Sequence, residues 1–164
     1  MMFHCSVDAK DPERVAKVVA ELWGGEALEF VPMANGCWAA VSGDERGTML
    51  EIQPYGCLMD HESSNGLTMD PEPSELVATH VAIGTVLSEE EVFAIAKREG
   101  WFARKMRRKG GFDLIELWAE NRLMFEVLTP DWQKEYMQNN SLEAWRTGMA
   151  RARAARDAAA AAAA

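Results

Sequence analysis

The sequence lacks the signatures of several large protein classes. It has three cysteines, Cys5, Cys37 and Cys57, with no Cys-x-x-Cys pair, which excludes a disulfide scaffold, a zinc finger and a thiol redox motif. Unpaired cysteines of this kind are typical of a reducing compartment. Outside the closing alanine run there is no apolar stretch of roughly 18 residues, so no membrane-spanning helix is expected. Residues 1–11 have neither the basic start nor the long apolar stretch of a signal peptide.

An excess of positive charge is also missing. Lys and Arg total 17 against 26 Asp and Glu, a formal net charge of −9. Such a chain repels a phosphate backbone, so nucleic acid is not expected as a partner. The length of 164 residues fits one domain, and the 48% apolar and 26% charged residues are typical of a globular protein. We expect a soluble, cytoplasmic protein that binds neither nucleic acid nor membrane.

The first part of the chain predicts the element order β-α-β-β-β. Apolar and polar residues alternate over 3–7, as in a strand with one buried face. Asp11 and Pro12 are typical of a helix start, apolar residues follow at helical spacing, and Gly24 ends the helix. Three further strands are predicted over 27–32, 37–42 and 48–54.

The same order then repeats. Residues 59–77 are rich in Gly, Ser, Pro and acids without periodicity and are predicted to be a linker. A strand-like segment over 79–86 follows, and Ser88 with Glu91 forms a helix capping box. Gly100 is predicted to end that helix. Three more strands are predicted over 101–107, 112–118 and 123–128.

This repeat predicts an α+β fold of one domain. Two βαβββ modules, residues 1–58 and 78–129, would pair because each has a sheet face that the other can cover. The result is a curved mixed sheet with a cleft. Residues 130–164 are predicted to be helical, with one helix from Pro130, a second capped by Asn140, and an alanine-rich tail.

Four polar residues recur at equivalent positions of the two modules. His4 and His80 lie in the first strand of each module, 76 positions apart, and Glu51 and Glu126 lie in the last strand, 75 positions apart. Strand alternation turns all four away from the apolar residues that face the helix. Each residue alone is more commonly a solvated or packed strand residue; the recurrence of all four favours a shared role.

We expect the shared role of these four residues to be metal binding. A buried carboxylate without a compensating cation costs several kcal/mol. Two imidazoles and two carboxylates suit one divalent ion such as Ni²⁺, Zn²⁺, Co²⁺ or Mn²⁺. We therefore predict that His4, Glu51, His80 and Glu126 are metal ligands in the cleft.

These segments resemble the vicinal oxygen chelate superfamily, most closely its glyoxalase I branch. The similar stretches are 3–8, 49–52, 79–83 and 124–127, within a likeness that covers about residues 2–130. The resemblance implies paired βαβββ modules, as in the glyoxalase, bleomycin-resistance and dioxygenase fold. It also implies a metal cleft and a homodimer whose sites involve both chains.

The resemblance further implies a metal-dependent lyase or isomerase. Glu126 would be the base that moves a proton between neighbouring carbons, with Glu51 as its counterpart. The substrate would be a small oxo-compound, in glyoxalase I the hemithioacetal of glutathione and a 2-oxoaldehyde, with glutathione as cosubstrate. Extradiol dioxygenases use two His and one Glu, and the epimerases usually carry Gln at the position of Glu51. An epimerase or ring-processing enzyme and a non-catalytic protein that sequesters a small molecule remain alternatives.

The basic run over 104–109 has two interpretations. It fits a charged hairpin that protects a sheet edge. It also fits a contact with an anionic substrate tail. The sequence leaves this choice open, together with the metal, the substrate and the geometry of the dimer.

Overall fold

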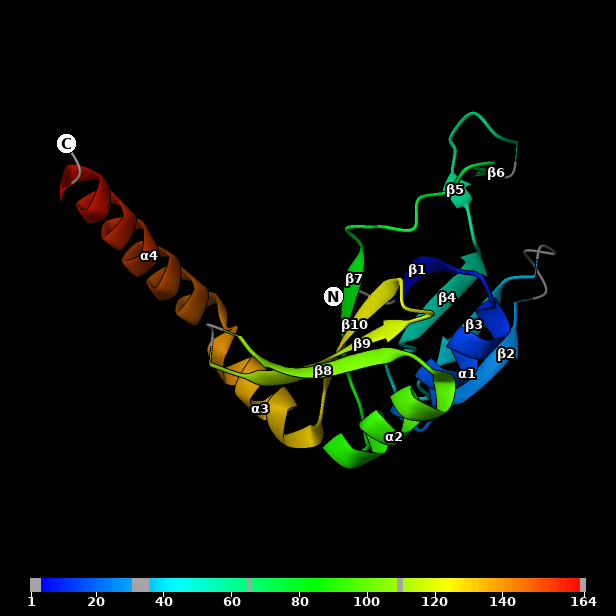
Figure 1. The fold of residues 1–164 in the computed structure, drawn as a ribbon, viewed down its shortest axis with the longest axis horizontal. Helices are drawn as coiled ribbons and strands as arrows, with labels where there is room; N and C mark the ends of the chain where they lie inside the picture. Colours follow the sequence, from blue (N-terminus) through cyan, green and yellow to red (C-terminus); the bar gives the residue numbers. More distant parts are fainter. Residues whose placement is uncertain (1–3, 31–35, 65, 109–110, 163–164) are drawn as a thin grey trace.

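A computed structural model describes residues 4–30, 36–64, 66–108 and 111–162 (Figure 1). Both modules have the expected element order, and the α+β class is confirmed. The first module is β1 (His4–Ala9), α1 (Pro12–Trp23), β2 (Glu26–Glu29), β3 (Trp38–Val41) and β4 (Met49–Pro54). The second is β7 (His80–Gly84), α2 (Glu89–Glu99), β8 (Phe102–Arg107), β9 (Asp113–Ala119) and β10 (Leu123–Leu128).

The two sheets have the same topology. Their strand orders are β1-β4-β3-β2 and β7-β10-β9-β8. In each sheet the first strand of the module pairs in parallel with the last one, and the remaining pairs are antiparallel. The strands that carry the four predicted ligands are therefore neighbours within each module.

The helix ends follow the predicted signals. The Asp11 side chain accepts the Arg14 backbone N–H at 3.1 Å and so begins α1. Ser88 and Glu91 form the complete capping box of α2. Gly24 and Gly100 end the two helices at φ values of 66° and 68°, a left-handed conformation that favours glycine.

One hydrophobic core joins the modules. Buried side chains of α1 and α2 pack on the helix-facing sides of both sheets in a single cluster. Val15, Leu50, Val92 and Phe125 are completely or almost completely buried in it. The modules therefore bury apolar surface in one shared core, which lies on the helix-facing sides of the sheets.

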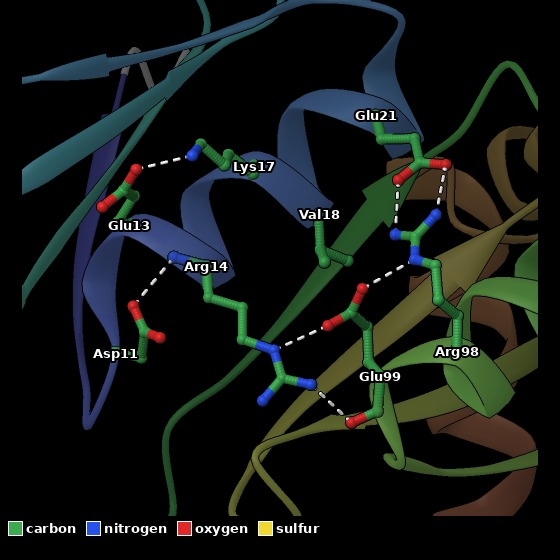
Figure 2. Close-up of a pocket in the computed structure, with 8 residues that line it drawn as sticks. All are labelled: Asp11, Glu13, Arg14, Lys17, Val18, Glu21, Arg98 and Glu99. Carbon is green, nitrogen blue, oxygen red and sulfur yellow. Dashed lines mark hydrogen bonds and ion pairs between the residues drawn. The ribbon is translucent and has the colours of Figure 1, made fainter.

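Ion pairs also connect the two helices. Arg14 on α1 donates to the Glu99 carboxylate at 2.6 Å, and Arg98 on α2 donates to Glu21 at 2.6 Å (Figure 2). Burial alone would raise the pKa of Glu99, but the hydrogen bonds from Arg98 and Arg14 lower it. A surface depression of about 380 Å³ lies over these pairs. Its two arginines are already paired with carboxylates, so they are not available to bind an anionic ligand.

Arg122 forms a second connection between the modules. Its side chain is 2% exposed and bonds the Asp8 carboxylate of β1 at 2.6 Å. Arg122→Ala is expected to lower the free energy of unfolding by about 2–4 kcal/mol, because it leaves a partly buried carboxylate without its cation. Arg98→Ala is the matched control, since Arg98 is 51% exposed and should cost about 1 kcal/mol or less. If denaturant unfolding showed the same loss of stability for both variants, Arg122 would not be a stabilising connection between the modules.

The segment between the modules differs from the prediction. Within residues 56–79, here called the arm, β5 (Cys57–Met59) pairs with β6 (Leu67–Met69) in a short antiparallel hairpin. The Gly, Ser and acidic residues that suggested an irregular linker form the turn and the flanks of this hairpin. The boundaries assigned to the modules remain predictions.

The C-terminal residues form two helices as expected, α3 (Pro130–Asn139) and α4 (Leu142–Ala162). The predicted cap of the second helix was wrong: the Ser141 hydroxyl, not Asn140, accepts the Ala144 backbone N–H at 3.2 Å. Figure 1 shows α4 projecting away from the sheets. None of the described helices combines the length and apolarity that a bilayer crossing requires.

Candidate functional site

The first module places His4 and Glu51 on the same sheet face. Ser6 pairs with Glu51 across the parallel β1–β4 ladder, and His4 pairs with Met49. The Ser6 hydroxyl donates to Glu51 Oε2 at 2.7 Å, which shows that these side chains point the same way. Leu50 and Ile52 lie on the opposite, buried face. The predicted facing is therefore confirmed for this module.

The second module repeats the arrangement. Ala82 pairs with Glu126, and His80 pairs with Met124. The His80 imidazole is exposed, with Nδ1 3.2 Å from the Ala78 carbonyl oxygen. Glu126 is half-buried and accepts a hydrogen bond from Arg108. This hydrogen bond and charge raise the pKa of the Arg108 guanidinium.

One chain does not gather the four residues around a single point. Among the residues described, no three His, Cys, Asp or Glu side chains lie close enough to hold one cation. His4 lines a cavity of about 90 Å³ with Ala82, the strand neighbour of Glu126, where β1 and β7 approach each other. The four side chains are of types that bind divalent ions, and within each module the histidine and the glutamate lie on the same sheet face. A single copy of the chain nevertheless presents them as two separate His–Glu pairs. Their role as ligands remains a prediction.

The sequence analysis missed Glu116. It lies in β9 directly opposite Glu126 on one side and Arg104 on the other. Glu116 is 3% exposed and accepts hydrogen bonds from Arg104 at 2.6 Å and Arg108 at 3.0 Å. A carboxylate flanked by apolar residues, the signal that identified Glu51 and Glu126, was present here too.

The basic run divides between two faces of β8. Arg104 and Arg108 contact the carboxylates of Glu116 and Glu126. Lys105 pairs instead with Glu89 at 2.7 Å, and Arg107 pairs with Asp113 at 2.9 Å. β8 is an edge strand of its sheet, which agrees with the charged-edge interpretation. Lys109 lies outside the described residues.

A larger cavity lies between the first sheet and the arm. Its volume is about 340 Å³, and Ser6, the hydrogen-bond partner of Glu51, is one of its lining residues. Leu58, Leu67 and Val77 of the arm form part of its wall. Burial raises the pKa of Cys57, another lining residue, so its thiol stays protonated at neutral pH. The cavity adjoins the face that carries the first His–Glu pair.

Comparison with known proteins agrees with this architecture. No protein-family model matches the chain, and no curated protein matches it by sequence. Among solved structures it is similar to the genomically encoded fosfomycin resistance protein FosX from Listeria monocytogenes. The TM-score is 0.53 at 12% identity, and the match covers 82% of this chain and 97% of FosX. The chain therefore shares the fold of FosX, in agreement with the fold that its resemblance to the vicinal oxygen chelate superfamily implied.

Further solved structures match the chain with lower TM-scores. The trypanothione-dependent glyoxalase I of Leishmania major is 17% identical with a TM-score of 0.49, covering 84% of this chain and 92% of that one. FosX from Mesorhizobium loti is 15% identical with a TM-score of 0.46, covering 77% of this chain and 89% of its own. The match to FosX from Listeria monocytogenes, at 12% identity, shows the fold alone. Activity has to be argued from the site residues.

Proposed function

We propose that this protein belongs to the vicinal oxygen chelate superfamily and is a divalent-metal-dependent lyase or isomerase of the glyoxalase I type. Its reaction would move a proton between neighbouring carbons of a small oxo-compound. The main support is the repeated His–Glu pair: each module carries one histidine and one carboxylate on adjacent parallel strands and on the same sheet face.

The ligands would be His4, Glu51, His80 and Glu126. A bound Ni²⁺, Zn²⁺, Co²⁺ or Mn²⁺ would supply a Lewis acid that stabilises negative charge on the substrate oxygens. Because one chain presents the donors as two pairs, we propose a homodimer in which each site takes one pair from each copy.

Glu126 is assigned the role of base, with Glu51 as its counterpart. In the hemithioacetal of a thiol and a 2-oxoaldehyde, the carboxylate would take the proton from the carbon that bears the hydroxyl and the sulfur. It would return the proton to the adjacent former carbonyl carbon, while the hydroxyl proton moves from the first oxygen to the former carbonyl oxygen. The product is a 2-hydroxyacyl thioester with the same atoms as the substrate. Arg108 and Ser6 hold the two carboxylates in place.

Metal content is the direct test of the ligand set. His4→Ala is expected to lower the bound divalent ion at least tenfold, because loss of one ligand removes a large part of the binding free energy. His61→Ala is the matched control, since His61 is exposed on the arm and is not a proposed ligand. Both variants would be dialysed against Ni²⁺ or Zn²⁺ and measured by mass spectrometry, with circular dichroism as a check on folding. Equal metal content would contradict the ligand assignment.

Sequestration of a small molecule without chemistry is a second candidate. The cavity beside Ser6 favours it, because a partly apolar pocket of this size can bind a ligand without a reaction. Mixing the metal-loaded protein with glutathione and methylglyoxal separates the two candidates. Appearance of the thioester absorbance supports the enzyme; binding without turnover of any thiol adduct supports sequestration.

A further inference from the structure

The cavity under the arm opens beside the proposed reaction centre. Ser6 is part of its wall and donates its hydroxyl to Glu51. The cavity extends from there along the β1–β4 face, where Gln53 of β4 also lines it, to Gly56 at the start of the arm. A substrate with its reacting atoms near Glu51 therefore has space in this direction for the rest of its structure.

The cavity suits an apolar group. Its volume of about 340 Å³ lies in the range of small-molecule sites. Leu58, Met59, Leu67 and Val77 contribute apolar side chains from the arm, and Leu123 contributes one from β10. Placing an apolar group against them would remove apolar surface of both partners from water.

The charge of the wall disfavours an anion. The lining residues within the described part of the chain include Asp8 and Asp70 but no Lys, Arg or His. Arg122, the cation bonded to Asp8, is itself buried. Lys10, at the base of the arm, is paired with Glu75 at 2.7 Å. A carboxylate group in the cavity would therefore meet Asp70 and the paired Asp8, and none of the described lining residues carries a positive charge to bind it.

We propose that this cavity binds the non-reacting group of the substrate, and that this group is apolar and carries no net negative charge. The inference rests on the proposed function and narrows its substrate class. Glutathione carries two carboxylates and one ammonium at neutral pH, so its adduct is disfavoured. The hemithioacetal of an uncharged thiol is the better substrate.

Turnover of two methylglyoxal adducts tests this selectivity. The wild-type protein is expected to show a higher kcat/KM with the adduct of uncharged N-acetylcysteamine than with the glutathione adduct. Val77→Lys should shift the ratio towards glutathione by about fivefold, because it introduces a cation into the wall. Leu76→Lys is the matched control: Leu76 is 85% exposed and is not a lining residue, whereas Val77 is 41% exposed and is one. Equal ratios in the two variants, or a wild-type preference for glutathione, would overturn the inference.

Binding without metal separates this inference from the proposed reaction. Calorimetry of the metal-free protein would compare S-butyl-N-acetylcysteamine with S-butylglutathione. Tighter binding of the uncharged probe, weakened at least fivefold by Leu67→Trp and not by Leu76→Trp, supports the cavity even if no adduct is turned over. If the uncharged probe binds in this way but no adduct is turned over, only the proposed reaction is contradicted. Equal binding of both probes, or no effect of Leu67→Trp in a folded protein, would overturn the cavity assignment while leaving any observed turnover intact.

Discussion

Glu126→Gln is expected to lower kcat by about a thousandfold, within the range for loss of a general base. Glutamine keeps the size and shape of the side chain but cannot accept the substrate proton. The fold should survive, because Arg108 retains its hydrogen bond to Glu116 after the Glu126 carboxylate is lost. Thioester formation measures the activity, and thermal unfolding measures the stability.

Glu89→Gln provides the matched control for this variant. Glu89 lies on α2 and pairs with Lys105 at the edge of the sheet, away from the contacts of Glu126. The same chemical change there should leave kcat within about twofold, since an exposed ion pair contributes little. Full activity of Glu126→Gln would remove this residue from the base role. Equal losses in both variants would point to a general effect of removing negative charge.

The order of the elements could be predicted because local signals decide it. Asp11, Ser88, Gly24 and Gly100 all make the capping contacts that their residue types predict. The facing of Glu51 and Glu126 followed from strand alternation, which is a property of the backbone and needs no knowledge of the partner strand. These parts of the prediction depend on neighbours in sequence.

The remaining features depend on neighbours in space. Glu116 meets Arg104 only because β8 and β9 pair in one particular register, and no local signal specifies that register. The arm hairpin was missed because its strands are three residues each and carry too short a pattern to detect. The four ligand candidates repeat in sequence, but whether they come together depends on how the two sheets pack. By our proposal it also depends on how two copies of the chain pack against each other.

Phe125→Ala is expected to lower the free energy of unfolding by about 3–5 kcal/mol, the usual cost of an unfilled aromatic site. Phe125 is 0% exposed and packs in the core that both modules share. Because domains of this kind are stable by only about 5–15 kcal/mol, the variant should lose a large part of its stability in denaturant unfolding.

Phe102→Ala is the control for this loss. Phe102 lies in the outer strand β8 with 53% of its surface exposed, and its replacement should cost about 1 kcal/mol or less. The comparison also tests the two faces of β10, since Phe125 and Glu126 are adjacent residues that point in opposite directions. Phe125→Ala should reduce stability far more than Glu126→Gln does. A Glu126→Gln protein as unstable as Phe125→Ala would mean that Glu126 supports the core, and the assignment of its sheet face to catalysis would be wrong.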